Sequence, residues 1–209
     1  VAACRKRGLG VVLYLNMWHR AAYDAHPEWR MVLPDGLGSV DSFHYRFGIC
    51  CINSGFGEFF LRLLDELNAS YDCLGIWIDM IGWHHSICYC PHCRARFERE
   101  TGAAELPRTV DWNDPGWLAF QQARARWLAE YADRVVATVK RRTPERSVAL
   151  QKASMLTGWV GATGPDFLHA GDYSAGDFTG DPIEQSCVCK LLALFSGGHA
   201  LEFMTPRCE

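Results

Sequence analysis

The residue with the clearest chemical potential is Asp79, which ends the short apolar run Gly75–Ile78. Indole and imidazole side chains follow it within six residues. Indole faces stack on the C–H surfaces of sugars, and imidazoles hydrogen-bond to hydroxyl groups. A lone aspartate at a strand end is more often a capping residue, but this company favours a carbohydrate site.

A second group of the same residue types follows residues 11–16, the first apolar run of the chain. It contains an amide, an indole and an imidazole within four positions, beginning at Asn16. A single histidine in such a place is usually structural. Together the two groups predict a sugar-binding pocket whose candidate contact residues are Trp18, His19, Trp83, His84 and His85.

Glycoside hydrolysis needs two carboxyl groups, one to attack or to activate water and one to protonate the leaving oxygen. A partner for Asp79 must come from a later segment that reaches the same place. The later acidic residues are Asp172, Asp177, Asp181, Glu184 and Glu202. Aspartate and glycine runs usually form turns, so the sequence favours none of these strongly.

Three cysteines form a close C-x-C-x-x-C group, Cys88, Cys90 and Cys93. Disulfides at this spacing would be strained, whereas three thiolates leave a tetrahedral zinc site one ligand short. Cys51 or Cys50 is our first choice for the fourth ligand, with His92 or His85 as alternatives. A closed structural site is favoured over a catalytic one, and free thiols without metal are the competing interpretation.

Alternating strand and helix patterns position these residues. Apolar runs predict strands at 11–16, 74–79, 147–151 and 200–204 and a further strand within 166–174, and 3.6-residue periodicity predicts helices at 57–69, 91–101, 115–142 and 182–196. This order is typical of a parallel α/β sheet. Polar residues come just after the predicted strands, as in a (β/α)8 TIM barrel, and no G-x-G-x-x-G motif or P-loop is present.

The length indicates a single domain, residues 1–209, that is a partial barrel of about five βα units, because eight units need roughly 250 residues. The 49% hydrophobic content and 12% aromatic content exclude disorder. The net charge of −3 and the absence of a long apolar run give no sign of a nucleic-acid or membrane partner. Scattered cysteines interpreted as thiols favour a reducing, cytoplasmic compartment.

The segments Tyr71–Asp79 and Cys88–Phe97 resemble the barrel domain of α-L-fucosidase-like glycoside hydrolases, closest to the group called hypothetical glycosyl hydrolase 6. Residues 26–29, 51–54, 180–190 and 202–207 look similar too. The cysteine group also resembles the zinc-binding cluster of family 42 β-galactosidases.

The resemblance implies a retaining, exo-acting α-L-fucosidase in which Asp79 is the nucleophile. Asp177, then Glu184, are the candidate acid/base residues, and the substrate is also expected to contact Asp172, Glu202 and Arg207. Structural zinc would bind Cys51, Cys88, Cys90 and Cys93, and the chemistry itself needs no cofactor.

Two alternatives stay open: a β-galactosidase-like hydrolase, and a non-catalytic sugar-binding or zinc-stapled domain. A five-unit barrel would expose two sheet edges and an apolar inner face. We therefore expect it to need a second copy or flanking segments, and to be inactive as an isolated fragment if these are missing.

Overall fold

A computed structural model describes residues 1–44, 47–83, 86–152, 159–177, 181–198 and 200–204. Its centre is a parallel sheet of five strands in the sequential order β1-β2-β3-β4-β5. The strands are β1 (Val12–Asn16), β2 (Gly75–Asp79), β3 (Ser147–Gln151), β4 (Tyr173–Asp177) and β5 (Ala200–Met204). A doubly wound sheet would reverse this order at a switch point. The uninterrupted order is that of consecutive strands in a barrel, as predicted.

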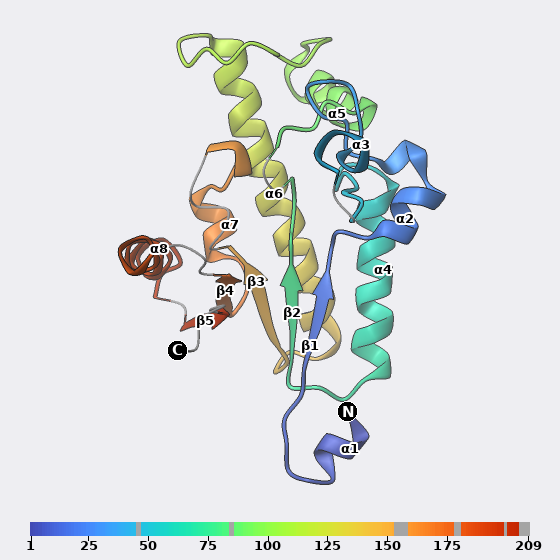
Figure 1. Ribbon diagram of the computed structural model, residues 1–209, viewed down its shortest axis with the longest axis vertical. Helices are drawn as coiled ribbons and strands as arrows, with labels where there is room; N and C mark the ends of the chain where they lie inside the picture. The colour runs from blue at the N-terminus through green and yellow to red at the C-terminus, as the bar shows by residue number, and fades with distance from the viewer. Residues whose placement is uncertain (45–46, 84–85, 153–158, 178–180, 199, 205–209) are drawn as a thin grey trace.

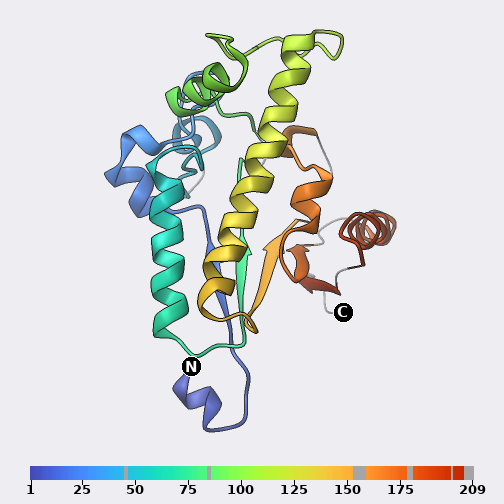
Figure 2. The same cartoon turned by 180° about the vertical axis from the view of Figure 1, so that it is seen from behind.

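Long helices cover one face of this sheet (Figures 1 and 2). Helix α4 (Gly55–Ser70) begins at Ser54, whose hydroxyl caps the Phe56 N–H, and α6 (Pro115–Arg142) begins at Asp114, whose carboxylate caps two N–H groups. Their apolar stripes pack against the strand residues that face them, including Ile76, Ile78, Val148 and Leu150. None of the described helices combines the length and apolarity that crossing a membrane requires.

The opposite face of the sheet carries no helix in these views and presents different residues (Figure 1). Tyr14, Trp77 and Ala149 share one register row there, and the Tyr14 and Trp77 rings lie 4.8 Å apart. Tyr14 is 51% exposed, and Val12 and Tyr173 are exposed too. In a closed barrel, this face would line the interior. Within the described residues β1 and β5 each pair on one side only, which agrees with the predicted partial barrel.

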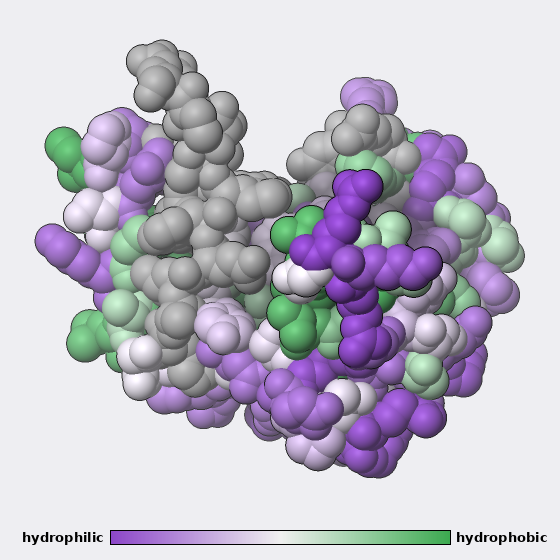
Figure 3. Space-filling model, turned by 90° about the horizontal axis from the view of Figure 1, so that it is seen from below, coloured by the Kyte–Doolittle hydropathy of each residue, from purple (hydrophilic) through white to green (hydrophobic). Residues whose placement is uncertain are grey.

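Two long insertions follow β1 and β2 and gather at the carboxyl end of the sheet (Figure 1). The first contains α2 (Arg20–Ala25), η1 (Pro27–Trp29) and α3 (Ser39–Phe43), and the second contains α5 (Pro91–Thr101). A 2.7 Å bond from the Tyr89 N–H to the Val32 carbonyl joins them. The amino-terminal end carries α1 (Ala2–Arg5), and Figure 3 shows hydrophilic and hydrophobic side chains side by side there.

The strand expected within 166–174 is wrong in its position. Residues 165–169 instead form helix α7 (Pro165–His169), with Pro165 at its first position and Asp166 in its first turn. Both are helix-start signals. Gly171 then adopts a φ of +83°, which favours glycine and reverses the chain into β4. Helix η3 (Trp159–Gly161) precedes α7, and α8 (Pro182–Phe195) follows β4.

Lys152 fixes the carboxyl end of β3 to these last elements. Its side chain is completely buried, and Nζ donates to the carbonyls of Leu168 (2.8 Å) and Ala170 (2.7 Å) and lies 3.3 Å from the Ser174 hydroxyl. These partners are neutral, and loss of solvation lowers the pKa of Lys152 to about 8.

This burial predicts a pH-dependent stability. Between pH 8 and 10 the folded chain has released the Lys152 proton, while the unfolded chain, with the ordinary pKa of 10.5, still holds it. The free energy of unfolding of wild type should therefore rise relative to that of Lys152→Met, by about 2 kcal/mol from pH 7 to pH 10. Urea unfolding at several pH values measures this. Lys6→Met, at an exposed position, is the control, and parallel curves for wild type and Lys152→Met would contradict the prediction.

Candidate functional site

The Asp79 carboxylate lies at the carboxyl end of β2 and accepts hydrogen bonds from two side chains and from the backbone. The Tyr14 hydroxyl and the Asn16 amide (3.3 Å) both donate to Oδ2, and the Met80 N–H donates to Oδ1 (2.9 Å). Asn16 and Asp79 are direct register partners, which is why β1 supplies two of the donors. Donors on both carboxylate oxygens suit an ionised carboxylate, which only accepts hydrogen bonds. At 4% exposure, Asp79 is held in one orientation.

The register of the later strands brings other polar positions to the same edge. Between β2 and β3, Ile78 pairs with Leu150, so Asp79 comes beside Gln151. In the next two strands, Gln151 pairs with Ala175 of β4, and Ala175 pairs with Glu202 of β5. Asp177 ends β4 and pairs with Met204. The backbone therefore places positions 177 and 202 toward the edge that carries Asp79.

The predicted aromatic contacts divide into two kinds. Trp18 is half-buried, and its backbone N–H donates to the Asn16 Oδ1 (2.7 Å). The His19 ring caps α2, because Nδ1 accepts the Ala22 N–H at 3.1 Å. Trp83 is 1% exposed and packs edge-on against Trp127, so it belongs to the core and is a correction to the predicted substrate contacts.

Tyr14 is a member of this candidate site that sequence reasoning missed. It stands two positions before Asn16 within an apolar run, so it resembled a core residue. Side chains alternate between the two faces of a strand, so Tyr14 must share a face with Asn16. This alternation was the signal that could have placed Tyr14 in the site.

Asp172 does not reach this edge. It precedes β4 at the amino-terminal end of the sheet, where Oδ2 accepts the Val148 N–H (2.8 Å) and pairs with Lys140 (2.7 Å). The prediction that it follows a strand is therefore wrong, since β4 begins later than expected. Asp181 caps α8, and Glu184 is exposed in the first turn of that helix. The predicted His84, His85 and Arg207 lie outside the described residues.

A buried cluster of four thiols joins the two insertions. Cys51 comes from the first insertion and Cys88, Cys90 and Cys93 from the second, and their sulfur atoms all lie within 4.8 Å of one another. Each cysteine is at most 2% exposed. Cys50 is not part of this group, and His92 instead contacts the Glu28 carbonyl (3.0 Å). The four residues chosen from the sequence are brought together, and such a group can hold a metal.

The acidity of these thiols differs because they share one small space. Burial raises the pKa values of Cys51 and Cys93, whereas hydrogen bonds from the other three cysteines lower that of Cys90. The other three thiols therefore favour the thiolate form of Cys90. A bound cation would favour the thiolate form of all four.

Asn53 is a further contact of the cluster that the sequence did not single out. Its backbone N–H points at the Cys51 sulfur (3.4 Å) and its side-chain amide at the Cys93 sulfur (3.3 Å). Arg96 donates to the Asn53 Oδ1 (2.9 Å) and fixes the amide orientation. Donors of this kind stabilise thiolate ligands from outside the ligand set.

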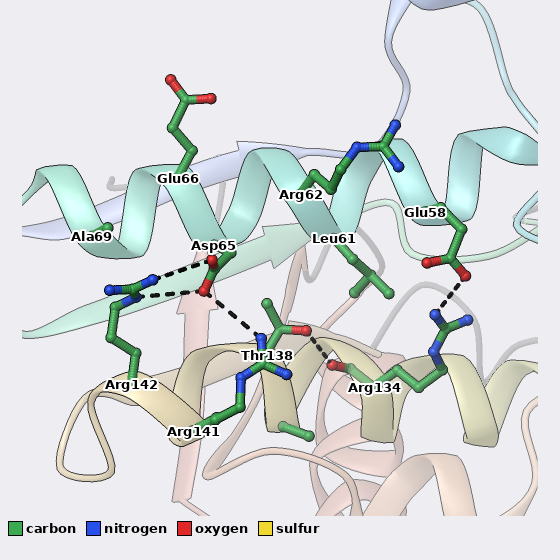
Figure 4. A pocket seen from close by; sticks show the side chains of 11 residues that line it. Glu58, Leu61, Arg62, Asp65, Glu66, Ala69, Arg134, Thr138, Arg141 and Arg142 are labelled. Atoms are coloured by element: carbon green, nitrogen blue, oxygen red, sulfur yellow. Dashed lines mark hydrogen bonds and ion pairs between the residues drawn. The ribbon is translucent and has the colours of Figure 1, made fainter.

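A groove of about 540 Å³ between α4 and α6 is a poorer candidate site (Figure 4). Ion pairs cross it, Arg134 with Glu58 (2.5 Å) and Arg142 with Asp65 (3.3 Å). Exposed pairs of this kind contribute about 0–1 kcal/mol each. The groove lies in the outer helical layer, away from the open face that carries Asp79 (Figure 2).

Comparison with known proteins agrees with this geometry. Residues 1–80 match the family described as hypothetical glycosyl hydrolase 6, a range that ends at Asp79 and Met80. It includes the resembling segments at 26–29, 51–54 and 71–79 and stops before the C-x-C-x-x-C group. A search of curated proteins gave no match.

Solved structures that this chain resembles include glycoside hydrolases. They include an α-L-fucosidase isoenzyme 2 from Paenibacillus thiaminolyticus (TM-score 0.58, 16% identity, 99% of this chain and 35% of that one). A β-galactosidase from Bacillus circulans sp. alkalophilus is similar over 93% of this chain and 34% of its own (TM-score 0.70, 14% identity). The PgaB (BpsB) glycoside hydrolase domain of Bordetella bronchiseptica matches 97% of this chain and 62% of its own (TM-score 0.69, 13% identity).

These likenesses establish the fold. The chain has the architecture of these glycoside hydrolases, and its sheet is part of a (β/α)8 barrel. The family match to residues 1–80 is also to a glycosyl hydrolase family. It spans about a third of the length of the fucosidase and the β-galactosidase.

The thiol cluster generates a prediction with an internal control. Cys51→Ser should abolish stoichiometric binding of Co²⁺, because one of four converging ligands is lost. The binding is measured by the thiolate-to-metal charge-transfer absorbance of the bound ion. Cys50→Ser should leave it intact, because burial raises the pKa of Cys50 to about 12 and its sulfur lies outside the group. Equal loss in both variants, with both folded by circular dichroism, would contradict the assignment.

Proposed function

We propose that the chain carries the catalytic edge of a retaining, exo-acting glycoside hydrolase that acts on α-L-fucosides. The observation that supports this most is the Asp79 carboxylate, held by Tyr14, Asn16 and the Met80 N–H at the carboxyl end of a barrel strand. Active sites of (β/α)8 barrels are built at this end. The family match of residues 1–80 and the fucosidase likeness favour the chemistry and substrate.

In the first step Asp79 attacks the anomeric carbon of the bound sugar. A bond forms between a carboxylate oxygen and that carbon while the bond to the leaving oxygen breaks. The Tyr14 hydroxyl holds Oδ2 in place, so the attacking carboxylate is oriented before substrate arrives. In the second step water cleaves the ester with the help of a general base, and the sugar leaves with its original anomeric configuration.

Asp177 is our choice for the acid that protonates the leaving oxygen and later activates water. It ends β4, two strands (about 9.6 Å) from β2 across the sheet, and stands two residues beyond Ala175, which is in register with Gln151. Retaining enzymes hold their two carboxyl groups roughly 5 Å apart, so the proposal requires the two side chains to converge. Glu202 is one strand further away, and Glu184 stands on α8, so both are alternatives.

We further propose that the four cysteines bind structural zinc. The donor set fits, because four buried sulfurs lie within 4.8 Å of one another and Asn53 donates toward two of them. Four thiolates complete a tetrahedral shell and leave no position for substrate. The ion would tie the two insertions together above the strand ends, and the hydrolytic step would not involve it.

Two other functions have specific support. The β-galactosidase likeness, with the higher TM-score of 0.70, favours a galactoside substrate. A non-catalytic sugar-binding domain would also use Trp18 and Asn16, with Asp79 as a hydrogen-bond acceptor. Turnover of 4-nitrophenyl α-L-fucoside against 4-nitrophenyl β-D-galactoside separates the two hydrolases, and binding of L-fucose without turnover would indicate the third function.

Replacing the nucleophile should remove catalysis without unfolding the chain. Asp79→Asn should lower kcat for 4-nitrophenyl α-L-fucoside by about 10³-fold or more, because no covalent intermediate forms. Asp79→Ala should regain turnover with azide, which enters the vacated space and gives a fucosyl azide. Asp172→Asn, at the opposite end of the sheet, is the control. Full activity in Asp79→Asn would reject the proposed role.

Zinc should be measurable independently of activity. Elemental analysis should find about one zinc per chain, and a chelator should lower the melting temperature, because metal binding adds to the free energy of folding. Cys93→Ser should lose both the metal and the chelator effect, whereas Cys187→Ser, at an exposed position outside the cluster, should keep them. A content below about half a zinc per chain would contradict the four-ligand site.

A further inference from the structure

Three tryptophans meet beside the amino-terminal end of α6. Trp112 precedes the helix, Trp117 lies in its first turn, and Trp159 begins η3. Their ring centroids are 5.5 to 6.2 Å apart, and all three pairs are edge-to-face, at 72° to 89°. Trp117 is fully buried, but Trp112 is 48% exposed and Trp159 is 43% exposed. The two outer indoles therefore form an open corner supported from beneath by the third.

Packing alone does not account for this exposure. Trp117 already reaches the core through Phe120 (6.3 Å), and the buried Arg124 donates to the Val160 carbonyl (2.5 Å), which ties η3 to α6. Two large indoles left about half exposed on a folded surface mark a binding surface more often than a structural one.

The corner lies toward the carboxyl end of the sheet, the end that carries Asp79. Trp112 belongs to the segment that follows β2, and Trp159 to the segment that follows β3. The strands point toward this end of the molecule, where α6 begins (Figure 1). Both outer indoles therefore lie beyond the same end of the sheet as Asp79.

The chemistry of the corner selects a sugar ring. A pyranose presents a C–H face that stacks on one indole and an edge that meets a second indole at right angles. Exposed polar side chains flank Trp112 at Asp111 and Asn113 and can accept or donate hydrogen bonds to ring hydroxyls. A purely apolar partner would leave these groups unpaired.

We propose that Trp112 and Trp159 form an outlying sugar-binding platform, which takes a pyranose unit of a glycan. The choice of ligand rests on the proposed function.

The test follows the indole N–H resonances of the chain by NMR, assigned with Trp112→Phe and Trp159→Phe. Titration with 2′-fucosyllactose, and with 4-galactosyllactose for the alternative substrate, should shift the Trp112 and Trp159 signals saturably and leave Trp117 nearly unchanged. The Trp112→Ala/Trp159→Ala double variant should bind the same trisaccharide about tenfold more weakly. Trp112→Phe/Trp159→Phe keeps the packing if the alanine variant unfolds, and Tyr71→Ala removes an exposed aromatic residue elsewhere as the control.

The outcomes distinguish this proposal from the proposed hydrolysis. If the chain hydrolyses an aryl glycoside but neither indole responds to either trisaccharide, the platform is rejected and the hydrolase stands. If both indoles respond but no aryl glycoside is turned over, the platform stands and the hydrolase is rejected. Signals that shift with protein concentration alone would mean that a second copy covers the corner, which also rejects the platform.

Discussion

The in-register parallel pairing of β1 with β2 is the constraint on which the proposed site depends. It sets Asn16 beside Asp79 and brings the Tyr14 hydroxyl onto the same carboxylate. A shift of one residue would turn every side chain of β1 to the other face and remove both donors. The register is held because the alternate residues, Leu13 and Leu15, pack against the core beneath the helices.

The covering helices decide which face of the sheet can do chemistry. α4 and α6 occupy one face with apolar side chains, so the polar and aromatic residues remain on the other. Their mutual contact is itself specific: the Tyr131 hydroxyl donates to the Gly57 carbonyl (3.1 Å), and the Asn68 amide donates to the Val139 carbonyl (3.1 Å). These buried polar contacts are satisfied, which favours a single arrangement of the layer.

The insertions after β1 and β2 are organised by a different principle. They contain only short helices, and segments of this size bury too little apolar surface to fold alone. The four-thiol cluster compensates by joining them at one point, with Asn53 and Arg96 orienting its surroundings. The same insertions gather at the carboxyl end of the sheet, so the cluster joins segments that surround the proposed site.

The local structure and the candidate chemical groups could be predicted from the sequence alone. Apolar runs and caps predicted four strands, the long helix over 115–142 and the thiol group, because periodicity and metal-ligand spacing are local properties. The positions of the polar and aromatic residues relative to the sheet, in contrast, could not be predicted without the tertiary structure. It buried Trp83, moved Asp172 to the opposite edge and added Tyr14 to Asp79. The physical reason is that burial and strand register arise from contacts between residues far apart in the chain, which no local pattern encodes.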